Sequence, residues 1–211
     1  SLNHNVRRIV AEKPVGYAFE PGQATMVAID KDGLREEKRP FTFTSLPIED
    51  RLEFTIKVYP SHEGMTDAVD DLKVGDQLLI GDAWGAIKFQ GPGVFIAGGA
   101  GITPMLSILR EQKQERSGKV NKLIFANSKE EDLFLADELD AYVDGEFLKV
   151  FSKERVEGAH HGRVDQDFLS EHIANFQQNF YVCGPPKMVE DVTSALQALG
   201  ADAAKIVTEA A

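Results

Sequence analysis

Cysteine is almost absent from this chain of 211 residues, because Cys183 stands alone. A single cysteine excludes an internal disulfide, and it excludes an iron–sulfur cluster held by cysteines of these residues. Groups of His, Cys, Asp and Glu with the spacing of metal ligands are missing too, so the sequence predicts no metal site. Any redox chemistry would therefore need an organic cofactor.

Long apolar runs and an excess of basic residues are also lacking. No stretch is long enough to span a bilayer, and the opening residues SLNHNVRRIV have neither the apolar core of a signal peptide nor the bias of a transit peptide. The formal net charge of −11 disfavours binding to nucleic acid or to an anionic membrane. We expect a cytoplasmic protein without membrane insertion, whose charge is compatible with a basic protein partner.

The chain does contain two different patterns of apolar residues, one in each half. Up to about residue 90, short apolar stretches alternate with turn signals such as EPGQ and DKDG, which is typical of a small antiparallel β-barrel. Only Thr66–Leu72 suggests a helix in this half. The expected strands lie at residues 25–29, 41–45, 52–59 and 76–82.

The second half alternates strands with longer amphipathic helices. The pattern predicts strands at 93–99, 122–127, 147–152, 180–184 and 205–209, with helices at 103–115, 132–143, 165–173 and 186–199. Buried strands joined by helices indicate a parallel α/β sheet with helices on both faces. We therefore expect two domains, residues 1–92 and 93–211, with a hinge at 89–93.

The stretch GGAGITP, residues 98–104, follows a buried strand and opens a helix. At such a turn an α/β sheet presents free backbone N–H groups and the positive end of a helix dipole to a phosphate. Gly99 and Gly101 allow close approach, Thr103 suits the helix cap, and Pro104 suits the first turn. Pro104 replaces the third glycine of the usual dinucleotide fingerprint, so an ordinary tight turn is an equally good interpretation.

Two further turns have the same chemistry. YVCGPPKM, residues 181–188, is again a strand, a sharp turn and a helix, so Cys183 and Gly184 would face the crevice beside Gly99. A buried, inert cysteine is the alternative, and nothing nearby supplies a base that would make Cys183 a nucleophile. In the first half, Gly64–Thr66 begins a short helix whose N–H groups could hold a second phosphate, although threonine is also a common helix cap.

The stretches RPFTFTS, GGAGITP and YVCGPPKM, in this order, resemble the ferredoxin–NADP reductase superfamily, in particular its flavodoxin/ferredoxin reductase branch. The resemblance covers nearly the whole chain and implies an FAD-binding barrel followed by an NAD(P)-binding domain. The implied activity is hydride transfer from the nicotinamide to the flavin. Electrons would then pass to a separate acceptor such as flavodoxin, ferredoxin or a small molecule.

The resemblance also implies roles for single residues. Arg39 would pair with the flavin phosphate, the Phe41 ring would lie against the flavin, and the Thr42 hydroxyl would lie near flavin N5. Cys183 would help to position the nicotinamide, and Glu209 matches a near-terminal acid of the family. Catalysis is assigned to Thr42, Cys183 and Glu209, and cofactor binding to Arg39, Pro40, Phe41, Thr42, Gly64, Met65, Thr66, Gly99, Gly101, Ile102, Thr103, Pro104, Ser128, Cys183, Gly184, Pro185 and Met188.

The sequence departs from the family pattern in several places. Phe41 replaces a frequent tyrosine, three aspartates follow Thr66 where a diphosphate would bind, and the first barrel strand is expected to be shortened or missing. Acidic residues at 130–132 follow the second strand of the nucleotide domain, where NADPH-dependent relatives place basic ones, so NADH is favoured over NADPH.

Two alternatives stay open. A nucleotide-binding regulatory or electron-transfer subunit of a larger complex would keep the fold with a silent flavin site. A dehydrogenase without flavin fits poorly, because no acid–base pair is present and His160 and His161 are expected in an exposed polar loop.

Overall fold

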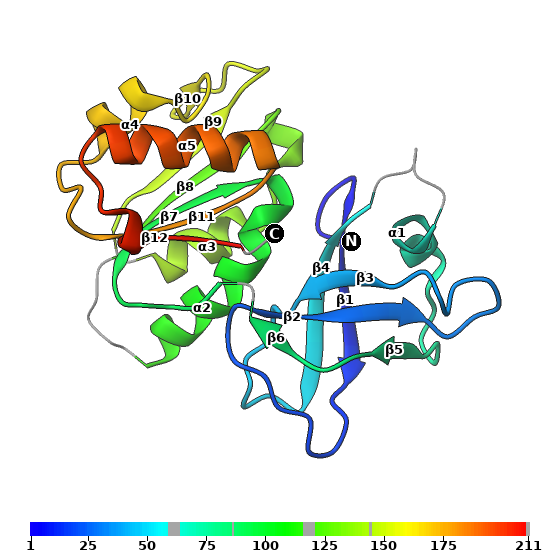
Figure 1. Ribbon diagram of the computed structural model, residues 1–211. Coiled ribbons are helices and arrows are strands. Elements are labelled where there is room, and N and C mark those ends of the chain that lie inside the picture. Colours follow the sequence, from blue (N-terminus) through cyan, green and yellow to red (C-terminus); the bar gives the residue numbers. More distant parts are fainter. Residues whose placement is uncertain (59–63, 86, 116–120, 144, 210–211) are drawn as a thin grey trace.

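The computed structural model describes residues 1–58, 64–85, 87–115, 121–143 and 145–209. Two lobes lie side by side in Figure 1, an antiparallel β lobe built from the first half of the chain and an α/β lobe built from the second. The expected fold class is therefore confirmed. The boundary at residue 92 stays a prediction, and it falls between strand β6 (Trp84–Gly85) and strand β7 (Gly93–Gly98).

The β lobe consists of two antiparallel sheets around one apolar core. Strand β1 (Val6–Glu12) pairs with β4 (Arg51–Lys57), and β2 (Gln23–Ile29) pairs with β3 (Arg39–Thr42), β5 (Leu78–Ile80) and β6. A bridge between Phe43 and Phe54 joins the sheets, and both rings are fully buried. Helix α1 (Met65–Ala68) covers one end of this core with Met65.

The α/β lobe is built on a parallel sheet, six-stranded among the described residues, with the order β10-β9-β8-β7-β11-β12. Helices α2 and α3 pack on one face, and α4 and α5 on the other. Every residue of β7 is buried, as expected for a central parallel strand. The other bounds are β8 (Lys122–Asn127), β9 (Phe147–Phe151), β10 (His160–His161), β11 (Asn179–Cys183), β12 (Ile206–Thr208), α2 (Thr103–Gln114), α3 (Ala136–Tyr142), α4 (Gln166–His172) and α5 (Pro186–Ala198).

Four sequence-based expectations were wrong in detail. The first barrel strand is present, because β1 pairs along its whole length with β4. The helix expected from residue 132 begins at Ala136, after Leu135 adopts a left-handed conformation with φ 55°. His160 and His161 form strand β10 rather than a loop; His161 is exposed as expected, whereas His160 is half-buried, with its ring 4.5 Å from that of Phe168. The strand expected at 41–45 instead spans Arg39–Thr42, and Phe43 turns into the core.

The segment between the lobes is anchored to the α/β lobe. The Tyr181 hydroxyl accepts a hydrogen bond from the Gln90 N–H at 2.8 Å and donates one to the Gly91 carbonyl at 2.7 Å. The Asn179 amide donates to the Pro92 carbonyl at 3.2 Å. This half of the expected hinge therefore belongs to the α/β lobe, and the orientation of the β lobe depends on contacts made elsewhere.

Candidate functional site: a cleft between the lobes

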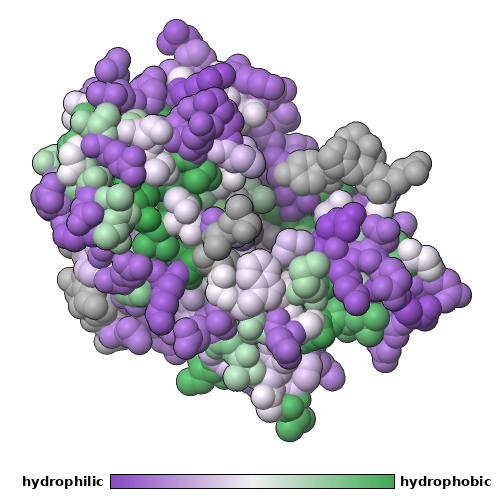
Figure 2. Space-filling model, viewed as in Figure 1, coloured by the Kyte–Doolittle hydropathy of each residue, from purple (hydrophilic) through white to green (hydrophobic). Residues whose placement is uncertain are grey.

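A cavity of about 880 Å³ lies between the two lobes and is lined from both. Figure 2 shows the surface hollowed at this junction, with apolar side chains reaching the surface of the α/β lobe nearby. The volume is large enough for a dinucleotide-sized ligand or for parts of two such ligands. The cleft is thus a single site that neither lobe forms alone.

All six strands of the parallel sheet deliver residues to the cleft at their carboxyl ends. This is the edge of an open α/β sheet at which ligands bind. The predicted residues among them are Gly99, Ser128, Cys183, Gly184 and Glu209, which follow or end β7, β8, β11 and β12. The residues that the sequence analysis missed are Asn127, Ser152, Gly162 and Arg163, at the ends of β8, β9 and β10. Taking the last residue of each predicted strand and the one or two residues after it as candidates would have identified them.

The glycine turn and the Cys183 turn pack directly against each other. A Cβ atom on Gly101 would lie 2.2 Å from the Cys183 carbonyl oxygen and 2.6 Å from the Gly184 nitrogen, so only glycine fits. Gly99 adopts φ +52° with open space beside it. Thr103 begins α2 and lines the cleft, and Pro104 follows it in the first turn, where no N–H is needed. Backbone N–H groups at this helix start are suited to an anion.

The β lobe contributes the opposite wall. Pro40, Phe41 and Thr42, which the sequence analysis assigned to cofactor binding, line it from β3. Phe41 is half-buried between the barrel core and the cleft, and Thr42 is only 7% exposed. The neighbouring strand β4 adds Thr55, Ile56 and Lys57, which the sequence analysis missed. The wall thus offers an aromatic face, hydroxyl groups and one cation.

Four predicted residues do not line the cavity. Arg39 lies exposed just before the wall, and its guanidinium donates to the Glu37 carboxylate at 3.1 Å. Met65 and Ile102 are buried in the two cores, so only their backbone groups could reach a ligand. Gly64 caps α1 at the edge of the described residues, while Thr66 beside it lines the cleft. Of the nearby aspartates, Asp70 is paired with Arg7, which reduces the expected crowding of negative charge.

Cys183 is held as a neutral thiol. It is 4% exposed, and its S–H donates to a carboxylate oxygen of Glu209 at 3.3 Å. Burial raises the pKa of the thiol far above its ordinary value, and the negative charge of Glu209 raises it further. Two of the three residues assigned to catalysis, Cys183 and Glu209, are therefore in contact, and the thiol keeps its proton at neutral pH.

We expect Cys183 to resist alkylation in the folded protein. Iodoacetamide reacts with the thiolate, and both the burial and the raised pKa of Cys183 suppress that form. Mass spectrometry after treatment at pH 8 should show almost no added mass for native protein and full modification in urea. Because this is the only cysteine of the chain, rapid modification of the native protein would contradict the assignment.

One buried amide on the cleft wall has no partner among the described residues. Asn127 is 8% exposed, and both its side-chain nitrogen and its oxygen lack a hydrogen bond within the part of the chain that the structure describes. An unsatisfied buried amide is costly, about 1–3 kcal/mol. A ligand with donor and acceptor groups, such as a ribose, would satisfy it. Together with the open space beside Gly99 and the helix start at Thr103, this fits a bound nucleotide.

Comparison with known proteins supports the class that this geometry indicates. Residues 95–194 match the family described as "Oxidoreductase NAD-binding domain". The chain is 31% identical over 217 residues to NADH–cytochrome b5 reductase 1 of Arabidopsis thaliana, covering 94% of this chain and 76% of that protein. It is 29% identical to NADH–cytochrome b5 reductase 2 of Mycosarcoma maydis and 28% identical to the reductase component of propane 2-monooxygenase of Mycolicibacterium goodii, covering 90% of this chain in each case.

A solved structure shares the arrangement of both lobes. The flavohaem-like FAD/NAD-binding domain of nitric oxide dioxygenase from Vibrio cholerae superposes with a TM-score of 0.86 at 21% identity, over 99% of this chain and 93% of that one. The fold of the two lobes is thus that of an FAD/NAD-binding domain. The chain belongs to the ferredoxin–NADP reductase superfamily of flavoproteins. It spans only 61% and 58% of the length of the M. maydis and M. goodii relatives.

Proposed function

We propose that this chain is an FAD-dependent NADH oxidoreductase that passes electrons to a separate acceptor. The observation that carries the proposal is the single cleft in which the Pro40–Thr42 wall faces the glycine turn at Gly99–Thr103. A flavin site on one lobe and a nicotinamide site on the other would bring two ring systems together there. When bound, the two cofactors supply the hydride and electron chemistry.

The chain's own residues would bind, orient and exclude water. Arg39 would release Glu37 to hold the flavin phosphate, Phe41 offers a stacking face, and the Thr42 hydroxyl can donate or accept near the reacting edge. On the other lobe, the N–H groups at Gly99–Thr103 would hold a pyrophosphate. The neutral thiol of Cys183 lines the cleft without adding charge.

Coenzyme choice rests on the far end of the cleft. Ser128, Ser152 and Arg163 line it, whereas Lys129 does not and instead pairs with Glu131 at 3.1 Å. Lys187 lines the cavity and pairs with Asp191 at 2.8 Å. Both lysines are thus engaged by carboxylates, which makes them poorer partners for a second phosphate on the ribose, so NADH remains the proposed coenzyme.

The acceptor is proposed as a separate molecule. Relatives are named for cytochrome b5 and for a monooxygenase system, and a flavodoxin, a ferredoxin or a small molecule would serve the same role here. Among the described residues, no helix combines the length and the apolar character needed to cross a bilayer. The proposed place of action is the cytoplasm, where a single free cysteine stays reduced.

Anaerobic spectroscopy tests the proposal. The purified protein, supplied with FAD, should show flavin absorbance that NADH bleaches faster than NADPH. Protein that takes up no FAD would refute the proposal. Bound flavin that neither nucleotide reduces would favour the regulatory-subunit alternative, and faster bleaching by NADPH would reverse the coenzyme assignment alone.

Replacing Arg39 by alanine should weaken FAD binding with the fold retained. A charge-assisted hydrogen bond to phosphate contributes about 1.5–3 kcal/mol, so the dissociation constant should rise roughly 10- to 150-fold, measured by fluorescence titration of FAD. Arg39 is exposed, and among the described residues its only ion pair is with Glu37, so the substitution should change the free energy of unfolding little. Arg51→Ala, which removes an exposed arginine paired with Glu49, is the matched control. An unchanged affinity in Arg39→Ala would contradict the assignment.

A further inference from the structure

Helix α2 connects the nucleotide end of the cleft to the β lobe through one line of side chains. Thr103, Ser107 and Arg110 are spaced by four and three residues, so they lie on one face of the helix. Thr103 lines the cleft, and fully buried Ser107 accepts a hydrogen bond from the Gly22 N–H of the β lobe at 3.0 Å. Arg110 lies about 10 Å from Thr103 along the helix axis.

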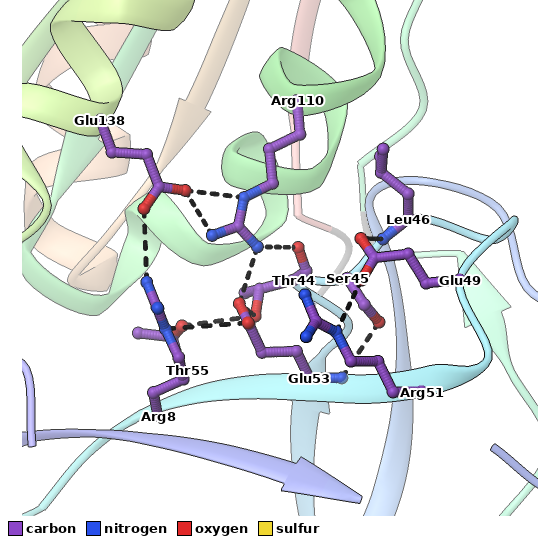
Figure 3. Close-up of polar contacts among 10 residues, drawn as sticks. All are labelled: Arg8, Thr44, Ser45, Leu46, Glu49, Arg51, Glu53, Thr55, Arg110 and Glu138. Atoms are coloured by element: carbon purple, nitrogen blue, oxygen red, sulfur yellow. Dashed lines mark hydrogen bonds and ion pairs between the residues drawn. The ribbon is translucent and has the colours of Figure 1, made fainter. Parts of the chain in front are cut away.

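Arg110 is the far anchor of this line. As Figure 3 shows, its guanidinium reaches across the interface to the carboxylate of Glu53 on β4, at 2.7 Å, and to the carbonyl group of Thr44. The Thr44 hydroxyl also donates to Glu53, at 2.9 Å. Thr44 is only two residues beyond Thr42, so Arg110 contacts the chain directly after the proposed flavin wall.

These contacts belong to a ring of four alternating charges. Arg110 also donates to Glu138 of α3 at 2.8 Å, and Arg8 of β1 bridges the remaining oxygens of Glu138 at 3.3 Å and Glu53 at 3.7 Å. Each lobe supplies one arginine and one glutamate, and so contributes no net charge. The glutamate from the β lobe is the most buried, with a side chain 5% exposed, and that of Arg110 is 12% exposed.

We propose that Arg110 is a positioning residue that fixes the distance between the glycine turn at the start of α2 and the Pro40–Thr42 wall. The inference rests on the proposed function for its catalytic consequence, but its geometric consequence holds without any cofactor. The segment between the lobes is held to the α/β lobe by Tyr181 and Asn179. The contacts along α2 therefore help to determine how the β lobe sits, together with those of Asn3, His4 and Lys57 to Glu131 and Asp132. Misplacing two reactants by about 1 Å can slow a reaction roughly 100-fold.

Two variants test the role. Arg110→Met removes the anchor but leaves Glu53 buried with a weakened set of partners, so the protein could fail to fold. The double variant Arg110→Met with Glu53→Gln removes that charge as well, while Arg8 and Glu138 keep their pair. Arg110→Lys keeps one charge without the planar fork and should recover part of the function. Arg51→Met is the control, because Arg51 pairs with Glu49 inside the β lobe.

The first readout is geometric. In the wild-type protein the Thr44 N–H donates to the Glu53 carbonyl and the Glu53 N–H donates to the Ser45 hydroxyl. In the double variant we expect faster hydrogen exchange at these two amides and a larger radius of gyration by X-ray scattering. The second is kinetic: FAD affinity should stay within about twofold, while the limiting rate of flavin reduction by NADH falls at least 10-fold.

Unchanged exchange and an unchanged reduction rate would overturn the proposal, as would equal losses of FAD affinity and reduction rate, which indicate a general structural role. Wild-type protein that takes up no flavin, or whose flavin NADH does not reduce, refutes the proposed function instead. In that case exchange and scattering alone decide: an altered lobe arrangement supports the positioning role and an unaltered one refutes it.

Discussion

Gly101→Ala is expected to weaken nucleotide binding at least 10-fold and to lower the free energy of unfolding by about 2–3 kcal/mol. The added Cβ would lie 2.2 Å from the Cys183 carbonyl oxygen. This oxygen belongs to the backbone, and a Cβ atom is fixed to its own backbone, so no side-chain rotation can relieve the clash. The two turns that form the floor of the cleft must then separate. Titration with NADH, together with urea unfolding followed by circular dichroism, measures both effects.

Substitutions at two other glycines distinguish the effect of this steric clash from the effect of backbone strain. Gly33, in the β lobe, has φ +82° and open space around it, so Gly33→Ala should cost only about 1–2 kcal/mol and leave nucleotide affinity unchanged. Gly99→Ala has a similar backbone cost, with φ +52°, but its methyl group would enter the cleft. It should therefore weaken nucleotide binding with only the modest destabilisation of Gly33→Ala. Wild-type affinity in Gly101→Ala would refute the role given to the paired turns.

The parts of the fold that the sequence predicted well are those determined by local pattern. Strand β7 is apolar throughout and β11 nearly so, and the period of α2 matches its buried face, so the α/β lobe followed from periodicity. The glycine turn could be placed because its chemistry is contained in seven consecutive residues. Helix α3 was misplaced at its start because the left-handed residue there is a leucine, which gives no turn signal.

The parts that could not be predicted depend on contacts between distant segments. Nothing local marks Arg110, Glu53, Arg8 and Glu138 as partners, since each reads as a surface charge on its own element. Lys57 of β4 and Asn127 of β8 likewise reach the cleft only because the two lobes face each other across it. Strand β1 was missed because exposed and half-buried residues dominate it after Val6, and its pairing with β4 is what stabilises it.

Glu53 should give the β lobe a distinct dependence on pH. Burial alone would raise the pKa of its carboxyl group, but the hydrogen bond and charge of Arg110, with the Thr44 hydrogen bond and the charge of Arg8, together outweigh burial and hold the pKa below its ordinary value. A depressed pKa contributes stability that is present above the unfolded value, about 4.3, and is lost as the pH falls through the folded value. Acid should therefore weaken the contact between Arg110 and Glu53 that joins the two lobes.

Glu53→Gln should lower the free energy of unfolding by about 2–3 kcal/mol at pH 7, because Arg110 loses its buried counter-charge but keeps Glu138. Since a protonated glutamate resembles glutamine, the two proteins should converge as the pH falls well below 4. Urea titrations between pH 7 and pH 3 measure this. Glu146→Gln is the control: Lys122 lowers the pKa of Glu146 as well, but its side chain is 54% exposed, so the change should stay below about 0.5 kcal/mol. A difference between wild type and Glu53→Gln that is constant with pH would show that Glu53 acts through packing rather than charge.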